Sequence, residues 1–448
     1  MILKKTAIYL LALLCLCALL CGCGAESAAK LEPVRFANTP ELRVDETTTE
    51  LTVVLQSGET QLLERLPSLE SCDFSGSECT GEIALWAKAH PDVDVYYTVS
   101  LPDGTVLDTK SKSADLSQMS GADIRKASEL LGCLPKLGSI NLGKERSSVT
   151  WEDIGVLQDA CPDSNYKFAF SLYGKDFDLQ NTQLNLSHIP VSDGGAAVRE
   201  VMAYMPKLTY LDMDSCGVSN EDMAAIRDDF PDIKVVWRIW FGSNLSYSVR
   251  TDVERILASK PSVAGFVDEY NGADLKYCTE VKYLDLGHNA PLADISFVKY
   301  MPKLEVAILA MGAWSDAGPL AYCPELEYLE MQTTRCTDLS PLSGLKKLRH
   351  LNIACIPELT DISPLYGLTE LERLWLGSNN MVPWEQVDKM QEAAPNCEID
   401  ASVYDDPTAG RWRYTADGTW NYRYYVLRKQ FDGYENSAFS FTWNDPLY

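Results

Sequence analysis

The amino-acid sequence predicts an α/β solenoid, in which stacked repeats each contribute one short strand. Three observations lead to this prediction: a leucine motif that recurs at a fixed interval, linking segments that keep its register, and longer upstream repeats that carry helical segments. The clearest copy of the motif reads "LERLWLGSN", with Leu371, Leu374 and Leu376 at the first, fourth and sixth places and Asn379 at the ninth. This spacing fits neither an amphipathic helix nor an alternating strand.

Five copies of this motif follow one another in the second half of the chain. They begin at residues 281, 304, 326, 348 and 371, so neighbouring copies lie 22 or 23 residues apart, which is the period of a leucine-rich repeat. Linking segments such as "TDLSPLSGLKK" and "TDISPLYGLTE" keep the same register. Because one repeat cannot bury its apolar residues alone, the copies must stack. We therefore expect a leucine-rich repeat horseshoe with a parallel β-sheet on its concave face and helical and irregular segments on its convex face.

Longer repeats precede the regular ones. Segments that start at Leu66, Leu134 and Met205 are each followed by a helical stretch, and their starts lie 68 and 71 residues apart. Each long repeat therefore accounts for about three turns of the solenoid. A helical segment of the same type, "PWEQVDKMQEAAPNCEID", closes the array. The predicted solenoid spans residues 48–403, with no internal domain boundary visible in the sequence.

The regular repeats resemble a known class of protein. The strand motif followed by "DISPL" is similar to the internalin-like leucine-rich repeats of bacterial surface proteins, over about residues 276–400. The resemblance implies the fold, and it leaves the ligand open because one fold serves many functions.

The N-terminus indicates export. Residues 1–22 combine Lys4 and Lys5 with an apolar run too short for a comfortable membrane span, as in a secretory signal peptide. The end of this run resembles the bacterial lipoprotein signal, which implies lipidation of Cys23; an uncleaved anchor is the alternative. Residues 23–47 have few large apolar side chains and are interpreted as a tether. We expect the mature protein to be lipid-anchored to the cell membrane, on its extracytoplasmic face.

Composition and motifs limit the function. The chain has 39 basic and 64 acidic residues, so nucleic acid is an unsuitable partner. Its four histidines lie outside any nucleophile or metal motif, and acid pairs such as Asp212 and Asp214 are expected by chance in so acidic a chain. We expect no enzyme, cofactor or metal. The leading function is a non-catalytic scaffold for a protein, peptide or glycan ligand; the alternative is a structural envelope component or adhesin, with a hydrolase last.

Several of the chain's 14 cysteines occupy apolar positions of the repeats. Cys278 and Cys323 stand where other repeats have leucine or methionine, and Cys397 also aligns with apolar residues, so we expect buried thiols. Cys216 stands where Asn289 and Asn379 stand in other repeats, and we expect it to cap backbone groups at the turn. The best candidates for a disulfide are Cys72 and Cys79.

Residues 404–448 lose the repeat and are rich in aromatic residues and arginine. This segment either folds over the open end of the solenoid, which otherwise exposes a strand edge and apolar core, or displays Trp412, Trp420 and Tyr424 for stacking on a sugar or peptide. Because terminal repeats need capping, we favour an aromatic C-terminal cap.

The concave face is the predicted ligand site. The first, fourth and sixth places of the motif point into the core, so the third and fifth places lie on the opposite face of the strand. Any sheet face carries some side chains, but these columns mix aromatic, arginine and amide groups of the kind that anchor interfaces. The predicted ligand-binding residues are Tyr283, Asp285, Tyr328, Glu330, His350, Asn352, Arg373 and Trp375. We expect Trp375→Ala and Tyr328→Ala to weaken binding without lowering the melting temperature.

Overall fold

A computed structural model of the chain describes residues 33–259, 266–379, 381–401 and 412. It has the predicted leucine-rich repeat fold, an α/β solenoid whose strands pair in parallel from one repeat to the next. The chain divides into two compact units, Met1–Lys167 and Phe168–Tyr448, although the sequence showed no internal boundary. The division falls within one strand, Asn165–Leu172, that begins an antiparallel hairpin. The sheet that contains this strand does not continue into the strands of the following repeat.

A hairpin precedes the repeats, which corrects the predicted extent of the tether. Strands β1 (Val34–Phe36) and β2 (Thr39–Val44) pair antiparallel. Val34 and Phe36 are 2% and 1% exposed, because the alternation of apolar and polar residues places both on the buried face of the strand. The tether was predicted to reach residue 47, and of that segment residues 23–32 lie outside the described residues.

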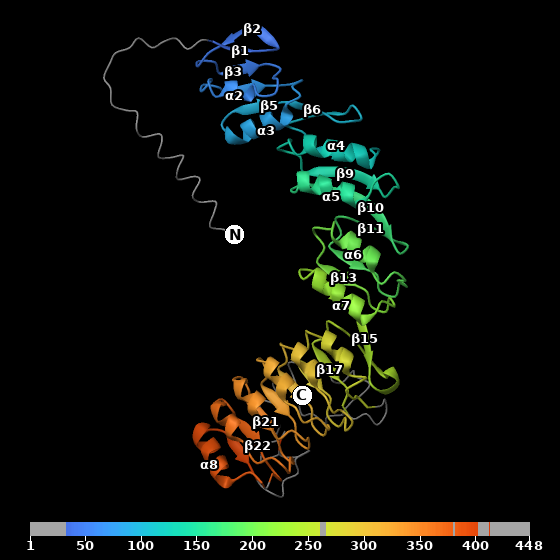
Figure 1. Ribbon diagram of the computed structural model, residues 1–448, viewed down its shortest axis with the longest axis vertical. Helices are drawn as coiled ribbons and strands as arrows, with labels where there is room; N and C mark the ends of the chain where they lie inside the picture. The colour runs from blue at the N-terminus through green and yellow to red at the C-terminus, as the bar shows by residue number, and fades with distance from the viewer. Residues whose placement is uncertain (1–32, 260–265, 380, 402–411, 413–448) are drawn as a thin grey trace, which may run out of the picture. The chain divides into compact units, whose positions relative to one another are not determined.

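Three long repeats follow, which combine short strands, two helices and an antiparallel hairpin (Figure 1). The first and third have three short strands besides the hairpin, and in the second the third strand is also the first strand of the hairpin. The first comprises β3 (Glu50–Thr52), α2 (Thr60–Leu63), β4 (Ser71–Asp73), α3 (Thr80–Ala89), β5 (Asp94–Tyr96), β6 (Thr98–Ser100) and β7 (Val106–Asp108). The second comprises β8 (Ser113–Asp115), α4 (Gly121–Leu131), β9 (Ser139–Lys144), α5 (Trp151–Ala160), β10 (Asn165–Leu172) and β11 (Lys175–Asp178). The third comprises β12 (Gln183–Asn185), α6 (Ala196–Met202), β13 (Tyr210–Asp212), α7 (Asn220–Asp229), β14 (Lys234–Val236), β15 (Arg238–Phe241), the 3-10 turn η1 (Ser243–Leu245) and β16 (Tyr247–Arg250). This arrangement agrees with the predicted three turns of solenoid per long repeat.

The long-repeat helices begin and end where their sequences indicate. Ser120 and Ser219 accept hydrogen bonds from backbone N–H groups at the starts of α4 and α7, and Thr150 forms a capping box with Asp153 at the start of α5. The residue that caps the C-terminus of α3, α5 and α7 stands directly before proline in each case, in the segments "AHPDV", "ACPDS" and "DFPDI". Proline disfavours helical geometry in the residue before it, so these helices stop there.

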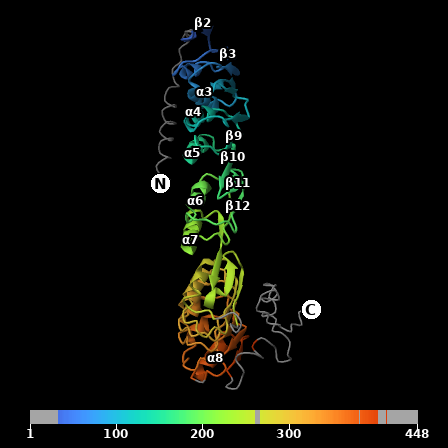
Figure 2. The ribbon, with the colours of Figure 1, turned by 90° about the vertical axis from the view of Figure 1, so that its right-hand side faces the viewer.

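The short repeats form one parallel sheet of seven strands, coloured from yellow to red in Figure 1. Its strands are β17 (Arg255–Leu257), β18 (Tyr283–Asp285), β19 (Val306–Ile308), β20 (Tyr328–Glu330), β21 (His350–Asn352), β22 (Arg373–Trp375) and β23 (Glu398–Asp400). The return segments contain 3-10 turns: η2 (Ala273–Tyr277), η3 (Ser296–Tyr300), η4 (Gly318–Tyr322), η5 (Ser340–Gly344) and η6 (Ser363–Gly367). The α-helix α8 (Trp384–Ala393) precedes the last strand. Figure 2 shows the short repeats and α8, in yellow to red, from a second side.

The core of the short repeats is built by the predicted leucine places. The middle residue of each strand from β18 to β22, such as Leu284, Leu329 or Leu374, is fully buried. Asn289 lies just after its strand, where its side chain donates to the carbonyl oxygens of Ala258 and Leu286, both at 2.8 Å, and accepts from the N–H of Val267 at 2.8 Å. The asparagine place of the motif thus caps backbone groups of two repeats, as predicted.

The turns after β18–β22 each contain a residue in the left-handed region. The N–H of His288, for example, donates to the carbonyl of Ala310 in the next repeat at 3.0 Å. L-residues rarely adopt this conformation, yet it recurs here at the repeat interval. The hydrogen bonds that these residues donate join the turns of successive repeats, as strand pairing joins the strands. The residues are His288, Met311, Thr333, Cys355 and Ser378, with φ between 53° and 65°.

The predicted burial of the cysteines is confirmed. Cys278, Cys323 and Cys397 are at most 4% exposed. Cys216 takes the capping place, and its thiol donates to the carbonyl oxygen of Leu186 at 3.0 Å. Cys72 and Cys79, the proposed candidates for a disulfide, are free thiols in the structure. Across residues 33–401, outside the two short gaps, no helix is long and apolar enough to cross a membrane.

Candidate functional site

The predicted ligand residues lie together on one surface of the short-repeat sheet. We call this surface the sheet face, and define it by the first and third residues of β18–β22: Tyr283, Asp285, Val306, Ile308, Tyr328, Glu330, His350, Asn352, Arg373 and Trp375. Parallel pairing in register places the first residues in one column and the third residues in another. The two columns that the sequence predicts are therefore present.

The sheet face is covered, which the sequence did not predict. Its eight predicted ligand residues are between 0% and 4% exposed. Trp412, the only described residue beyond position 401, belongs to the apolar cluster on this face and is 2% exposed. Display of Trp412 to solvent for stacking is therefore wrong, and Trp420 and Tyr424 lie outside the described residues. Ligand binding on this face stays a prediction, but it requires the cover to leave.

Aromatic rings surround the Trp412 indole on the sheet face. Its ring centroid lies 5.6 Å from that of Tyr328, 5.8 Å from that of His350 and 5.9 Å from that of Trp375. The interplanar angles of 45–62° are tilted or edge-on, which are arrangements that aromatic quadrupoles favour. The three neighbours come from β20, β21 and β22, so three successive repeats build one aromatic site.

Polar groups fix the orientation of Trp412. Its indole Nε1 donates to Glu330 Oε1 at 3.0 Å, and the Tyr328 hydroxyl donates to the same oxygen at 2.5 Å. Arg373 donates to the backbone carbonyl oxygen of Trp412. The guanidinium carbon of Arg373 also lies 5.8 Å from the centroid of the Trp412 ring, a cation–π geometry. The site therefore contacts the ring, the N–H and the peptide carbonyl of one tryptophan.

Arg373 is itself held in position. Its Nε and Nη2 atoms donate to the two carboxylate oxygens of Glu398 at 3.1 Å and 3.2 Å. Its guanidinium carbon lies 5.1 Å from the ring centroid of Trp375. A bidentate carboxylate fixes the plane of a guanidinium group, so Glu398 on β23 orients the donor that reaches Trp412.

The acidic side chains of the chain have structural roles where the structure describes them as pairs. Among the described residues there is no group of three or more His, Cys, Asp or Glu side chains that could hold a metal ion. The acid pair Asp212 and Asp214 has a structural role: Arg250 Nη1 lies 3.0 Å from Asp212 Oδ2, and Arg238 donates to both oxygens of Asp214 at 2.7 Å and 2.8 Å. The hydrogen bond from Arg238 lowers the pKa of Asp214, which keeps this carboxylate ionised and attaches the β15–β16 hairpin to β13.

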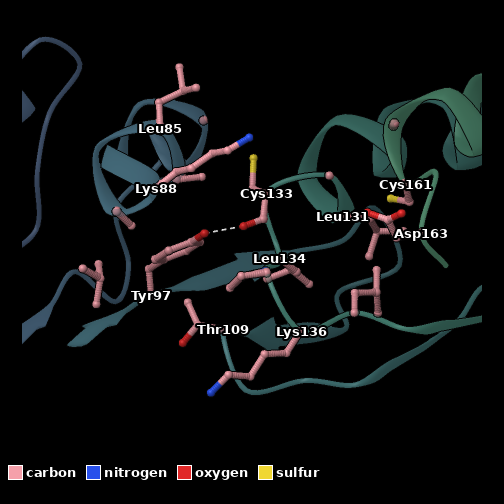
Figure 3. A pocket seen from close by; sticks show the side chains of 18 of the residues that line it. Leu85, Lys88, Tyr97, Thr109, Leu131, Cys133, Leu134, Lys136, Cys161 and Asp163 are labelled. Carbon is pink, nitrogen blue, oxygen red and sulfur yellow. Dashed lines mark hydrogen bonds between the residues drawn. The ribbon is translucent and has the colours of Figure 1, made fainter. Parts of the chain in front are cut away.

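A groove in the long repeats is a second concave feature. It encloses about 1040 Å³ and is lined by α3 and by the segments that follow α4 and α5. Figure 3 shows the Tyr97 hydroxyl directed at the backbone carbonyl of Cys133, to which it donates. Burial raises the pKa of the Cys133 thiol, so it is a poor nucleophile. The groove carries equal numbers of basic and acidic side chains and selects no ligand by charge: Lys88, Lys110 and Lys136 with Asp94, Glu129 and Asp163.

No protein-family model matches the chain, and no curated protein matches it in sequence. Among solved structures, internalin C2 from Listeria monocytogenes matches with 17% identity over 62% of this chain and 92% of that chain, at a TM-score of 0.28. A second internalin of that species matches with 14% identity over 81% and 88%, at 0.28. A leucine-rich repeat protein from Leptospira interrogans matches with 16% identity over 80% and 95%, at 0.30. The fold assignment itself rests on the repeats and the parallel sheet described above.

The position of Trp412 is the part of the site that sequence reasoning missed. The motif predicts which side chains share the sheet face, since strand alternation fixes this. The motif relates one strand to the next, but it does not relate a residue outside the repeats to any particular strand. The composition of the sheet face was the one sequence feature that could have indicated this contact. Its aromatic rings lie beside a carboxylate and an arginine, and such a surface suits a tryptophan or tyrosine side chain from the C-terminal segment. Cys23, the predicted lipidation site, lies outside the described residues.

Proposed function

We propose that the protein is a non-catalytic binding scaffold, lipid-anchored through Cys23 on the extracytoplasmic face of the cell membrane, whose sheet face holds a segment of a partner protein or peptide. One observation supports the binding role above the others. A single tryptophan is contacted on the sheet face through its ring, its indole N–H and its backbone carbonyl. Contacts to a peptide group as well as a side chain favour a polypeptide ligand over a glycan.

The chemistry of the sheet face fits interface anchors. Tyrosine, tryptophan and arginine dominate the binding energy of protein interfaces when they lie in desolvated sites, and Tyr328, Trp375 and Arg373 are each at most 3% exposed. The strands that carry them are fixed by parallel pairing on both sides. Such a face is pre-organised, which reduces the entropy lost when a ligand binds.

The anchor is tested by mass spectrometry of the mature N-terminus. A two-chain lipid gives stable membrane attachment, so we expect the wild-type protein to partition with membranes and to carry the modification on Cys23. Cys23→Ser should release the protein or leave the precursor uncut. An unmodified mature N-terminus at another residue would contradict the proposed anchor.

The binding role is tested by capture from envelope and host extracts with the mature chain that carries Cys23→Ser. A captured partner should bind Tyr328→Phe about tenfold more weakly, because the hydroxyl that holds the Glu330 carboxylate is lost. Tyr322→Phe is the matched control, since Tyr322 ends η4 and is 63% exposed. A partner that binds both variants equally would place binding away from the sheet face. Self-association with no captured partner would favour a structural envelope component or adhesin.

A further inference from the structure

The contacts made by Trp412 have the form of a recognition site for a tryptophan side chain. The indole N–H reaches a carboxylate oxygen of Glu330, which is 1% exposed, and the backbone carbonyl of Trp412 receives a hydrogen bond from Arg373, which is 3% exposed. An apolar pocket would bury an indole without either charged group. Burying charges is costly unless they have partners. We therefore infer that the two charged groups, Glu330 and Arg373, define which side chain and which backbone atom fit the site.

We propose that the sheet face recognises a partner segment that presents tryptophan, and that Trp412 occupies this site as an internal competitor. The inference rests on the proposed binding role of the same face. A partner tryptophan would place its ring among Tyr328, His350 and Trp375, donate its N–H to Glu330 and offer its peptide carbonyl to Arg373. Binding would require Trp412 to leave the site.

The geometry selects tryptophan among the aromatic residues. Glu330 Oε1 already accepts a hydrogen bond from the Tyr328 hydroxyl and needs a second donor along the direction of the indole N–H. Phenylalanine and leucine supply no donor, so they would leave that position of a buried carboxylate without its second partner, which is costly. A site built to hydrogen-bond one group discriminates strongly against a ligand that lacks it.

Internal occupancy sets how tightly a partner can bind. A ligand that binds only the open form has an apparent affinity reduced by the fraction of molecules that are open. Trp412 is on the same chain as its site, so it competes at a high effective concentration whatever the concentration of protein. The wild-type chain should therefore respond only to a partner that presents tryptophan together with further contacts.

The test measures binding of N-acetyl-L-tryptophanamide to the full mature chain with Cys23→Ser, by titration calorimetry. This probe carries the indole and two peptide groups. We expect the Trp412→Ala variant to bind it at least about tenfold more tightly than the parent chain, because the competitor is removed. 3-Methylindole, which has the ring but no carbonyl, should bind the same variant several-fold more weakly.

A matched control separates recognition from the filling of a cavity. Trp314→Ala removes another fully buried tryptophan, whose Nε1 donates to the carbonyl of Leu309. A cavity there takes apolar rings, so 3-methylindole should bind this variant at least as well as the amide. In the Trp412→Ala background, Glu330→Gln should weaken binding of the amide by about tenfold, since a hydrogen bond to a charged acceptor becomes one to a neutral acceptor.

Two results would overturn the inference. One is equal binding of the amide to the parent chain and to Trp412→Ala; the other is the same preference for 3-methylindole in Trp412→Ala as in Trp314→Ala. If Trp412→Ala does not fold, Trp412→Phe decides: it keeps one aromatic ring but loses the N–H donor and part of the ring area, so it should compete less well and let the amide bind more tightly than in the parent. A folded Trp412→Phe that binds no more tightly than the parent would also overturn the inference.

Failure of this inference is distinct from failure of the proposed function. A captured partner that binds the sheet face, loses affinity in Tyr328→Phe and is not displaced by the amide would leave the function standing and reject tryptophan recognition. Binding of the amide to Trp412→Ala, with no partner captured by either chain, would leave the recognition chemistry standing and reject the scaffold function.

Discussion

The strands of the long and short repeats share one motif but differ in what covers them. In β3, β8 and β12 only the middle residue is buried, and the residues on either side of it are exposed. In β18–β22 all three residues of every strand are buried. The motif therefore guarantees burial of the core residue alone, and the burial of the sheet face in the short repeats has another source.

That source includes Trp412, and it changes the nature of the face. Side chains such as Glu330 and Arg373 would otherwise contact water, but here they are buried, and buried polar groups need hydrogen-bond partners. Three of their hydrogen bonds go to Trp412 or to residues that contact it. In the short repeats the sheet face thus contributes to stability, whereas on β3, β8 and β12 of the long repeats it is a solvated surface.

The largest effect is expected when one sheet-face side chain is truncated to alanine in each region. Trp375 is fully buried on β22 and its ring lies 5.9 Å from that of Trp412, so Trp375→Ala should lower the free energy of unfolding by about 3–5 kcal/mol. Gln183, at an exposed face position on β12, is the control: Gln183→Ala should change it by no more than about 0.5 kcal/mol. Urea denaturation of the two variants measures both values.

This expectation replaces the one drawn from sequence, in which Trp375→Ala left the melting temperature unchanged. That expectation assumed an open face, and the burial of Trp375 removes the assumption. If Trp375→Ala unfolds at the same urea concentration as wild type, Trp412 does not cover the face in solution, and the short and long repeats do not differ as described.

The fold was readable from the sequence because it depends on local periodicity. The spacing of Leu371, Leu374 and Leu376 fixes which side of the strand is buried, and the parallel register follows from stacking equal repeats. The buried hairpin at Val34 and Phe36 was missed because only two short strands carry it. The cover on the sheet face was missed for a different reason: contact between Trp412 and Glu330, 82 residues apart, is decided by side-chain chemistry and not by any period in the chain.

A smaller effect on stability is expected from the residues that cap the turns after the strands in the two regions. Asn289 makes three hydrogen bonds to backbone groups of the short repeats, and its removal should lower the free energy of unfolding by about 2–3 kcal/mol in Asn289→Ala, because buried backbone groups lose their partners. Cys216 takes the same place in a long repeat and makes a weaker thiol contact. Cys216→Ala should cost only about 1 kcal/mol.

The caps are measured by thermal or urea unfolding of both variants. Equal losses would show that the thiol and the amide satisfy the turn equally well, and would remove this distinction between the regions. A larger loss in Cys216→Ala would show that the long repeat depends more on its turn than the short repeat does.

The smallest expected effect concerns a buried thiol at high pH. Burial raises the pKa of Cys323 in a short repeat from its usual value near 9 to about 12. Between these values the unfolded chain has lost the thiol proton and the folded chain has kept it, so the unfolded state binds fewer protons and stability falls as pH rises. The contribution is fully present below pH 9, and at pH 10 it should be reduced by about 1.4 kcal/mol.

The change is isolated by comparing wild type with Cys323→Ala at pH 8 and pH 10 in urea. The variant loses the apolar contacts of the thiol at both pH values. Both chains keep the other buried thiols, so wild type should lose more stability than the variant between pH 8 and pH 10, and the difference is the contribution of Cys323. Cys133→Ala is the long-repeat counterpart: this half-buried thiol lines the groove, and its pKa is raised by burial with a hydroxyl contact acting in the opposite direction. The pH-dependent difference between wild type and Cys133→Ala should therefore be the smaller one. If it equals or exceeds that of Cys323→Ala, the groove is closed to water in solution, and the long repeats bury their thiols as fully as the short repeats do.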